Sequence, residues 1–269
     1  MVSTTLRRHE VVCAALSLVA SVLLPVCVET LQSEVRSRPI TVAAAADLKF
    51  AMDDLVNEFR SLRPDLDVRV TYGSSGNFFA QLSNGAPFDL FFSADVDYVR
   101  QLRVRNLILP GSEFTYAVGR LVLWVPRSSP LDLNQGAAIL RAASVRRVAI
   151  ANPRHAPYGR AAEAAMKSLK VYDAVRSKLV FGENVAQAAQ FVESGAADIG
   201  VIALSLASSP TLVKEGRFWE IPLSSYPRMD QGGAILKRTR DPEAARALTA
   251  FVLEARGRAI LQRFGFFLP

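Results

Sequence analysis

Two short stretches of small and polar residues could hold an anion without reacting with it. They are residues 43–48 (AAAADL) and residues 72–77 (YGSSGN), and each follows a short run that is typical of a β-strand. Each also precedes a helical pattern, so each predicts a strand, a tight turn and a helix N-terminus. A helix N-terminus carries free backbone N–H groups and a partial positive charge, and both attract anions. The pair therefore indicates a protein that binds an anion.

Cysteine and histidine, which serve in many metal sites and catalytic centres, are scarce in this chain. The cysteines are Cys13 and Cys27, and the histidines are His9 and His155. All of them except His155 lie in an N-terminal segment that we expect to be removed. The mature protein would then have no disulfide framework and no zinc site of cysteines and histidines. Metal binding by carboxylates alone stays open.

The first 30 residues have the pattern of a secretory signal. Arg7 and Arg8 precede an apolar run over residues 11–28, which matches a charged n-region followed by an h-region. The alternative is an uncleaved membrane anchor, because the run approaches the length of a spanning helix. We expect a signal peptide over residues 1–30 and a periplasmic or otherwise extracytoplasmic protein.

The chain carries a formal net charge of +7, and this value is unchanged when residues 1–30 are left out, because two basic and two acidic residues leave together. A positive body suits an anionic ligand, although solubility explains the charge equally well. No basic run of five residues and no nucleic-acid-binding module is recognisable in the sequence. We therefore expect no nucleic-acid partner.

Strand and helix patterns alternate along the rest of the chain. Besides the strands before the two opening stretches, the expected strands cover residues 88–93, 121–125, 148–150 and 199–203. The expected helices cover residues 52–62, 78–82, 95–104, 160–169, 184–193, 244–255 and 257–263. This alternation predicts an α/β fold with a mainly parallel sheet. Ligands of such sheets bind outside the carboxyl ends of the strands, where both opening stretches lie.

A collinear set of motifs makes a family resemblance specific. Residues 84–95 (NGAPFDLFFSAD) are close to a GAP-DLF-SAD signature, residues 42–48 and 73–76 match two anion-binding loops, and residues 151–159 (ANPRHAPYG) match a third. With these motifs the chain resembles the periplasmic molybdate-binding proteins of ABC transporters, which are type II periplasmic binding proteins. The likeness extends over residues 40–268.

The resemblance implies an α/β, two-lobed periplasmic-binding-protein fold, each lobe a mainly parallel sheet flanked by helices, with the ligand in the cleft. One lobe would hold residues 40–120 plus 224–269, and the other residues 121–223. The implied function is a solute-binding protein that captures molybdate or tungstate, closes over it by a hinge motion and delivers it to a membrane ABC permease. The resemblance implies no enzyme activity and no cofactor, with the molybdenum held only through its oxygens. We expect a monomer.

The family's contacts to the oxyanion map onto individual positions of this sequence. Its loop serine corresponds to Ser75, whose hydroxyl and N–H can both donate, and a serine here is also a favoured helix cap. Val185 corresponds to a valine that binds the ligand through its backbone N–H. Tyr158 falls where members have alanine or tyrosine, and we expect its N–H to face the anion. A family tyrosine is replaced by Ala203, so the Tyr158 hydroxyl could supply the missing donor.

Asp47 departs from the family pattern, because many members have a serine that donates to the ligand at this position. A carboxylate beside a dianion is repulsive and cannot donate unless it is protonated. Three interpretations compete. Asp47 caps its helix and turns away from the ligand, which we favour; or a neighbour such as Lys49 neutralises it; or it accepts a hydrogen bond from a protonated oxyanion. In each case we expect Asp47 to line the site.

Two other functions remain as alternatives. One is a binding protein for another tetrahedral oxyanion, such as phosphate or sulfate, and the third interpretation of Asp47 would favour phosphate over molybdate or sulfate. A serine hydrolase is a remote alternative, because residues 73–76 (GSSG) lack the G-x-S-x-G spacing. His155 is the sole histidine left for a catalytic triad, and we expect it to be an exposed loop residue.

Overall fold

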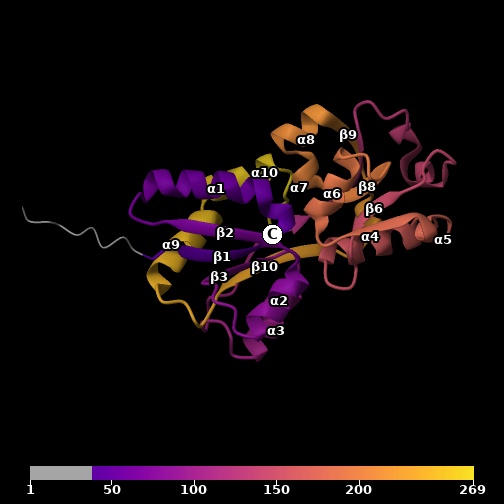
Figure 1. Cartoon of the computed structure of the whole chain (residues 1–269). Helices are drawn as coiled ribbons and strands as arrows, with labels where there is room; N and C mark the ends of the chain where they lie inside the picture. Colours follow the sequence, from indigo (N-terminus) through magenta and orange to yellow (C-terminus); the bar gives the residue numbers. More distant parts are fainter. Residues whose placement is uncertain (1–37) are drawn as a thin grey trace, which may run out of the picture. The chain divides into compact units, whose positions relative to one another are not determined.

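Two five-stranded sheets form the framework of residues 38–269, the part of the chain that the computed structural model describes (Figure 1). In the first sheet the strand order is β2-β1-β3-β10-β4. Its strands are β1 Ile40–Ala45, β2 Val68–Gly73, β3 Leu90–Ser93, β4 Phe114–Gly119 and β10 Met229–Ile235. Strand β1 pairs in parallel with β2 and β3, while β10 is antiparallel to β3 and β4. Four strands therefore point one way and β10 is reversed.

Helices cover both faces of the first sheet. They are η1 Ala46–Leu48 (a 3₁₀ turn), α1 Lys49–Leu62, α2 Ser75–Ser83, α3 Val96–Val104, α9 Pro242–Leu253 and α10 Ala255–Arg263. Helices α1, α9 and α10 pack on one face, and α2 and α3 pack on the other. The alternation along β1 explains this arrangement, because Val42 and Ala44 face the first group while Ala43 faces the second.

The second sheet repeats this plan with the strand order β7-β6-β8-β5-β9. Its strands are β5 Leu121–Pro126, β6 Val148–Ala151, β7 Leu179–Gly182, β8 Ile199–Ala203 and β9 Gly216–Glu220. Strand β6 is parallel to β7 and β8, and β5 is antiparallel to β8 and β9. Again four strands point one way, and the reversed strand is β5. The predicted mainly parallel character of both sheets is confirmed in this sense.

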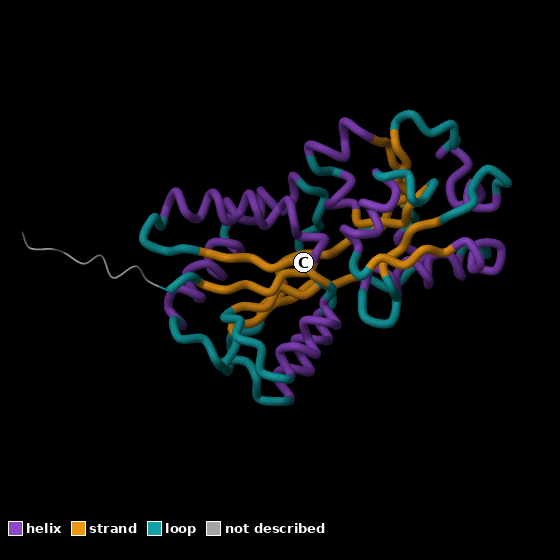
Figure 2. The backbone as a smooth tube through the Cα atoms, viewed as in Figure 1, coloured by secondary structure: helices purple, strands orange, loops and turns teal. Residues whose placement is uncertain are grey.

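The helices of the second half pack around that sheet. They are η2 Leu133–Arg141, α4 Pro157–Ser168, α5 Tyr172–Val175, η3 Arg176–Lys178, α6 Val185–Glu193, α7 Leu204–Ala207, α8 Pro210–Glu215 and η4 Leu223–Ser225. Strand β5 is buried from Leu121 to Val125, as a central strand of a covered sheet should be. Figure 2 shows the strands running through the middle of both halves with helices outside them.

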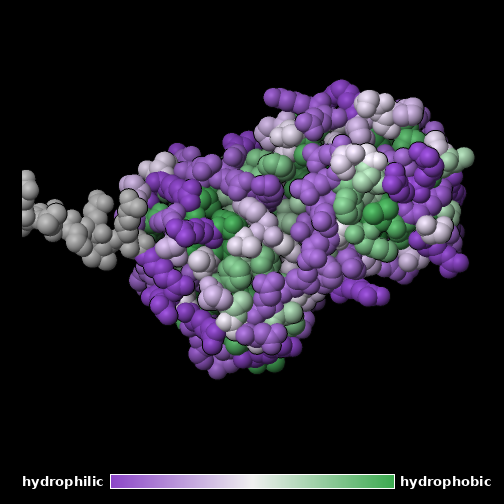
Figure 3. All heavy atoms as spheres, in the orientation of Figure 1, coloured by the Kyte–Doolittle hydropathy of each residue, from purple (hydrophilic) through white to green (hydrophobic). Residues whose placement is uncertain are grey.

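The chain passes between the two sheets twice, and these passages define the two-lobed architecture. Strand β4 leads directly into β5 through Arg120, and β9 leads into β10 through residues 221–228. The reversed strand of each sheet is the one that follows such a passage. The two-lobed α/β fold is therefore confirmed, and the residue limits given above for each lobe stay a prediction. Figure 3 shows hydrophilic side chains over most of one face, with smaller hydrophobic groups between them.

The predicted signal segment, residues 1–30, and its alternative as a membrane anchor lie outside the described residues. Among the helices of residues 38–269, none is both long and apolar enough to cross a bilayer.

Candidate functional site

A small cavity lies where four helices begin, and all four sequence-predicted site residues line it. Its volume is about 10 Å³, which is close to the space that one water-sized sphere occupies. The lining residues are Ala45, Ala46, Asp47, Gly73, Ser74, Ser75, Ala94, Ala156, Pro157, Tyr158, Asn184 and Val185. They belong to the starts of η1, α2, α4 and α6 and to the ends of the strands before them. Both sheets thus direct their strand ends and helix N-termini at one point.

In the first lobe, the start of α2 presents Ser75 to the cavity. The preceding Ser74 caps the helix, because its Oγ accepts a hydrogen bond from the Asn77 N–H at 3.4 Å. The first N–H groups of a helix have no partner within it, so the Ser75 N–H is free for a ligand. Ser75 Oγ accepts from the Ala94 N–H at 3.0 Å, which leaves its hydroxyl proton to donate. Ser75 is fully buried.

In the second lobe, helix α6 presents the backbone of Val185. The cap residue Asn184 accepts hydrogen bonds from the N–H groups of Ala186 and Gln187, each at 3.0 Å. The N–H of Val185, the first residue of the helix, is left to point at the cavity. The buried valine side chain belongs to the core of the second lobe. The geometry therefore agrees with a backbone role for this residue.

Helix α4 presents Tyr158 in a similar way. Pro157 occupies the first helical position, where its missing N–H does no harm, and Tyr158 follows with a free N–H. Its hydroxyl, by contrast, is turned toward the first lobe and accepts a hydrogen bond from Gln231 Nε2 at 3.2 Å. Burial raises the pKa of Tyr158 well above its usual range, and the nearby Asp47 adds to the shift. The backbone N–H, rather than the hydroxyl, is therefore the donor placed for a ligand.

Asp47 lines the cavity as expected, but its environment differs from the interpretation that we favoured. The carboxyl group is 1% exposed, and its Oδ2 accepts from Gln231 Nε2 at 2.7 Å. No side chain caps η1 or α1, so Asp47 is not the helix cap. Its other oxygen, Oδ1, is buried and has no hydrogen-bond partner among residues 38–269. Burial raises the pKa of Asp47 to about 6. Hydrogen bonding by the Gln231 and Tyr158 side chains favours the ionised carboxylate and lowers the pKa, but by less than burial raises it.

Lys49 does not neutralise Asp47, which corrects the second interpretation. Its Nζ pairs instead with Asp53, one turn further along α1, at 3.5 Å. The same ammonium lies over the rings of Phe50 and Tyr72. Lys49 therefore interacts with groups on the outer face of α1 and not with Asp47. The third interpretation, a hydrogen bond between Asp47 and a protonated ligand, stays open.

Gln231, on the reversed strand β10, is a site residue that the sequence did not reveal. It is fully buried, and both the nitrogen and the oxygen of its side-chain amide form hydrogen bonds. Nε2 donates to Asp47 and Tyr158, while Oε1 accepts from the Tyr116 hydroxyl at 2.9 Å. The amide therefore ties β4, β10 and η1 to α4 of the other lobe. A single glutamine before two glycines offers no motif that would have identified it.

Several contacts join the two lobes around the cavity. The Gly76 N–H of α2 donates to the His155 carbonyl at 2.9 Å, and Ser74 Oγ lies 2.8 Å from His155 Nδ1. Asn77 donates to Glu183 on the opposite lobe. His155 is half-buried and bonded across the cleft, so the expectation that it is an exposed loop residue is wrong. The structure therefore shows the lobes in contact.

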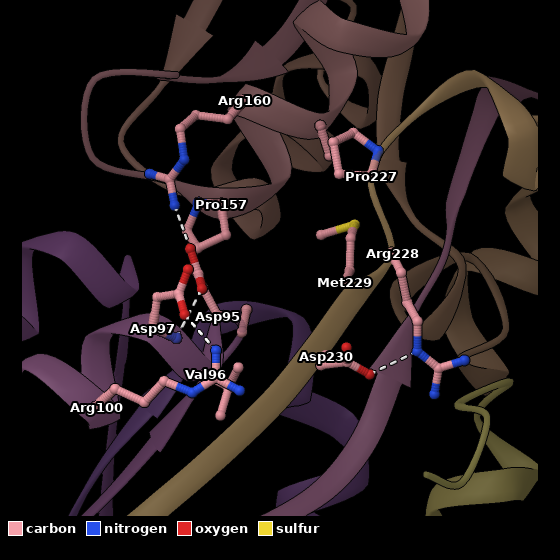
Figure 4. A pocket seen from close by; sticks show the side chains of 12 residues that line it. Asp95, Val96, Asp97, Arg100, Pro157, Arg160, Pro227, Arg228, Met229 and Asp230 are labelled. Atoms are coloured by element: carbon pink, nitrogen blue, oxygen red, sulfur yellow. Dashed lines mark hydrogen bonds and ion pairs between the residues drawn. The ribbon is translucent and has the colours of Figure 1, made fainter.

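A larger cavity of about 400 Å³ adjoins the small one at the mouth of the cleft (Figure 4). The two share Ala94 and Pro157 in their walls. Across this mouth the Arg160 guanidinium of α4 pairs with Asp95 at 2.6 Å and donates to the Tyr98 hydroxyl at 3.1 Å. The other arginines of the wall also carry aspartate partners, Arg100 with Asp97 and Arg228 with Asp230. The mouth is therefore charged but locally balanced.

No group of three or more histidine, cysteine, aspartate or glutamate side chains within residues 38–269 is arranged to hold a metal ion. The donors around the small cavity are instead N–H and O–H groups, which suit an anion.

Comparison with known proteins agrees with this geometry. Residues 40–267 match the family model described as bacterial extracellular solute-binding protein. The molybdate-binding protein ModA of Azotobacter vinelandii is 35% identical over 227 residues, which cover 84% of this chain and 89% of the relative. ModA of Rhodobacter capsulatus is 36% identical over 200 residues, covering 74% and 77% respectively.

A solved structure gives the same result at the level of the fold. The periplasmic molybdate-binding protein of Azotobacter vinelandii matches with a TM-score of 0.79 and 33% identity, covering 86% of this chain and 99% of that one. The resemblance drawn from the sequence motifs is thereby confirmed. This chain belongs to the family of bacterial extracellular solute-binding proteins.

Proposed function

We propose that this protein captures molybdate, and also tungstate, outside the cytoplasm and delivers it to the membrane permease of an ABC transporter. The observation that carries the proposal is the convergence of four helix N-termini, two from each lobe, on one cavity. The molybdate-binding relatives, which match most of the chain, support the choice of ligand. We further propose a periplasmic location and a monomeric state.

The donor set explains how such an anion would be held. A fully ionised tetrahedral oxyanion only accepts hydrogen bonds, and Ser75, Tyr158 and Val185 all offer donors to the cavity. The partial positive charges of the helix N-termini offset the negative charge without a counter-ion. The molybdenum would be bound only through its oxygens, with no direct protein ligand. Molybdate and tungstate have nearly equal size, so the same donors would serve both.

We infer that the ligand is released unchanged rather than turned over. Ser74 and His155 lie within hydrogen-bonding distance, as a nucleophile and its base would. However, Ser74 is the cap of α2, and no carboxylate of the described chain is bonded to His155 to orient it. The contact between Ser74 and His155 instead joins the two lobes, and we infer that it stabilises their closed arrangement.

One observation favours a second candidate ligand. The unpartnered Oδ1 of Asp47 could accept a hydrogen bond from an oxyanion that carries a proton, such as phosphate. Sulfate, which is fully ionised at neutral pH, has no such proton to offer. A phosphate-binding protein is therefore the alternative to test.

Isothermal titration of the purified protein with molybdate, tungstate, sulfate and phosphate tests the proposal. We expect one-to-one binding of molybdate and tungstate, with at least hundredfold weaker binding of sulfate and phosphate, because donors set for a larger anion do not all reach a smaller one. Tight binding of phosphate without molybdate would replace the proposal by the second candidate.

A further inference from the structure

The buried Asp47 carboxylate has one oxygen for which the described chain provides no partner. Oδ2 is satisfied by Gln231, whereas Oδ1 is buried without a hydrogen bond. A buried polar atom left unpaired is unfavourable, so such atoms often mark a place that a ligand completes. Asp47 also lines the small cavity. Its free oxygen therefore belongs to the site in which we propose that the oxyanion binds.

The groups that face Asp47 give its charge no cationic partner. The titratable ones are Tyr158 from α4 and Tyr116 from β4, and burial raises the pKa of both hydroxyls well above the usual range, so both stay neutral. From β10 the neutral Gln231 faces it, and from α7 the Ser205 hydroxyl donates to the Asp47 carbonyl at 2.8 Å.

The remaining elements packed against η1 are α1, β2 and α6. Their nearby charged or titratable groups are Lys49, Asp53 and Tyr72, which bond to one another on the outer side of α1. From α6 the neighbours at the cavity are the neutral Asn184 and Val185. Within residues 38–269, therefore, no cation is placed to offset Asp47 when an anion arrives.

An ionised carboxylate and a dianion cannot form a hydrogen bond with each other, because both only accept. They also repel strongly in a site from which water is excluded. A single proton between Oδ1 and an anion oxygen removes both difficulties. Molybdate and tungstate near neutral pH do not bring that proton, so the solvent must supply it.

We propose that the oxyanion enters the site together with one proton, which Asp47 Oδ1 binds and donates to an anion oxygen. The step forms one O–H bond at Asp47 and takes the proton from water or buffer, with no other bond made or broken. The combined charge of carboxylate and dianion falls from −3 to −2. This inference rests on the proposed function. In its protonated form Asp47 donates a hydrogen bond to the anion instead of repelling it.

The electrostatic environment supports this inference. Burial raises the pKa of Asp47 to about 6 in the closed site. A dianion at hydrogen-bond distance raises it further, since a neighbouring negative charge disfavours the ionised carboxylate. Asp47 then changes from ionised to protonated on binding at neutral pH. The affinity should fall as the pH rises above about 6, by up to tenfold per pH unit.

Titration calorimetry with molybdate in two buffers of different ionisation enthalpy measures the protons taken up. For the unaltered protein between about pH 6.5 and about pH 8 we expect uptake approaching one proton per anion, with affinity falling across the range. Asp47→Asn, whose amide can donate without a proton, should take up none and bind with an affinity independent of pH. At about pH 8 it should bind at least tenfold more tightly than the unaltered protein.

Asp53→Asn is the matched control, since Asp53 lies near Asp47 in sequence but on the outer side of α1. It should keep both the proton uptake and the pH dependence. Molybdate binding by the unaltered protein without proton uptake would overturn the inference and leave the proposed function standing. No molybdate binding at any pH would overturn both. Because the proton count is measured on the unaltered protein, the result does not depend on the folding of a variant.

Discussion

At the scale of single residues, the buried network around Asp47 is the feature that most needs a physical explanation. Each side-chain hydrogen-bonding group of Gln231 has a partner, so its amide is held in one orientation. That orientation presents an N–H to Asp47 Oδ2, which favours the ionised carboxylate. Burial acts more strongly in the opposite direction and leaves the pKa at about 6. The position thus combines an incomplete hydrogen-bond set with a titration near neutral pH.

This titration predicts how the stability of the protein depends on pH. The pKa of Asp47 is about 6 in the folded chain and 3.8 as a free side chain, so the folded state binds the proton more tightly. The contribution of Asp47 to the stability is therefore fully present below about pH 4 and is lost as the pH rises through about 6. The loss should reach about 3 kcal/mol above that pH.

Asp47→Asn should remove this loss. In the absence of molybdate we expect the variant to exceed the unaltered protein in unfolding free energy by about 3 kcal/mol at about pH 8, with no difference near pH 4. Urea unfolding at both pH values measures the gap, and Asp53→Asn serves as the control. A gap of equal size at the two pH values would show that Asp47 does not titrate as described.

Ser75→Ala tests the donor role of the Ser75 hydroxyl. This hydroxyl accepts from the Ala94 N–H and keeps its proton for the cavity. A hydrogen bond to a charged partner contributes about 1.5–3 kcal/mol, so molybdate affinity should fall by about tenfold to a hundredfold. Ser83→Ala, at the far end of the same helix, should leave the affinity unchanged. Equal affinities of all three proteins in calorimetry would exclude the hydroxyl from the site.

At the scale of elements, the helix starts both build the cavity and hold the lobes together. Asp95 caps α3 in the first lobe and pairs with Arg160 of α4 in the second. Arg160→Gln should weaken closure and raise the Kd for molybdate by about twofold to fivefold, a modest change because the pair is partly exposed. Arg100→Gln is the control, because its partner Asp97 lies on the same helix. Identical Kd values for the two variants would remove Arg160 from the closing contacts.

The elements that carry the site were the ones most visible in the sequence. Within residues 40–62, and again within residues 68–83, a strand pattern is followed closely by a helical pattern. The structure has β1 and α1 in the first range and β2 and α2 in the second. Helix α6 and strand β8 follow the predicted ranges closely for the same reason. Ser75 lies in one of the two opening stretches, before a predicted helix, so the local pattern pointed to its place on the cavity, whereas Val185 was identified only through the family resemblance. Local pattern and site position coincide because strand ends and helix starts make the site.

What the sequence did not reveal depends on contacts between distant segments. Strand β10 contains Gly232 and Gly233, which lack the side chains that identify a strand, and its pairing with β3 and β4 makes it one. Gln231 joins the site only through that pairing. His155 looked like an exposed loop residue, because the lobe that covers it comes from a remote part of the chain. Tertiary contacts therefore decided each of these positions.

At the scale of the whole molecule, the approach of the two lobes depends on close backbone contact at Gly76. This glycine lies in the first turn of α2, and its N–H bonds to the His155 carbonyl of the other lobe at 2.9 Å. A Cβ at this position would overlap that carbonyl oxygen, and the nearest atom of the first lobe would be the movable Tyr98 hydroxyl at 2.8 Å. The space for a side chain is therefore limited mainly by the closed arrangement of the lobes.

Gly76→Ala should consequently separate folding from closure. Alanine favours a helix more than glycine does, so the ligand-free variant should unfold at the same temperature as the unaltered protein or slightly above it. Closure would require the His155 segment to move back, at a cost of about 1–3 kcal/mol, and molybdate affinity should fall by about tenfold to a hundredfold.

Gln81→Ala, on the exposed side of α2, is the control for the helix itself. Thermal unfolding with and without molybdate measures both effects, because a ligand that binds only the folded protein raises the midpoint by an amount that grows with the logarithm of its affinity. An unchanged molybdate shift in Gly76→Ala would mean that the anion is held without the contact between α2 and His155.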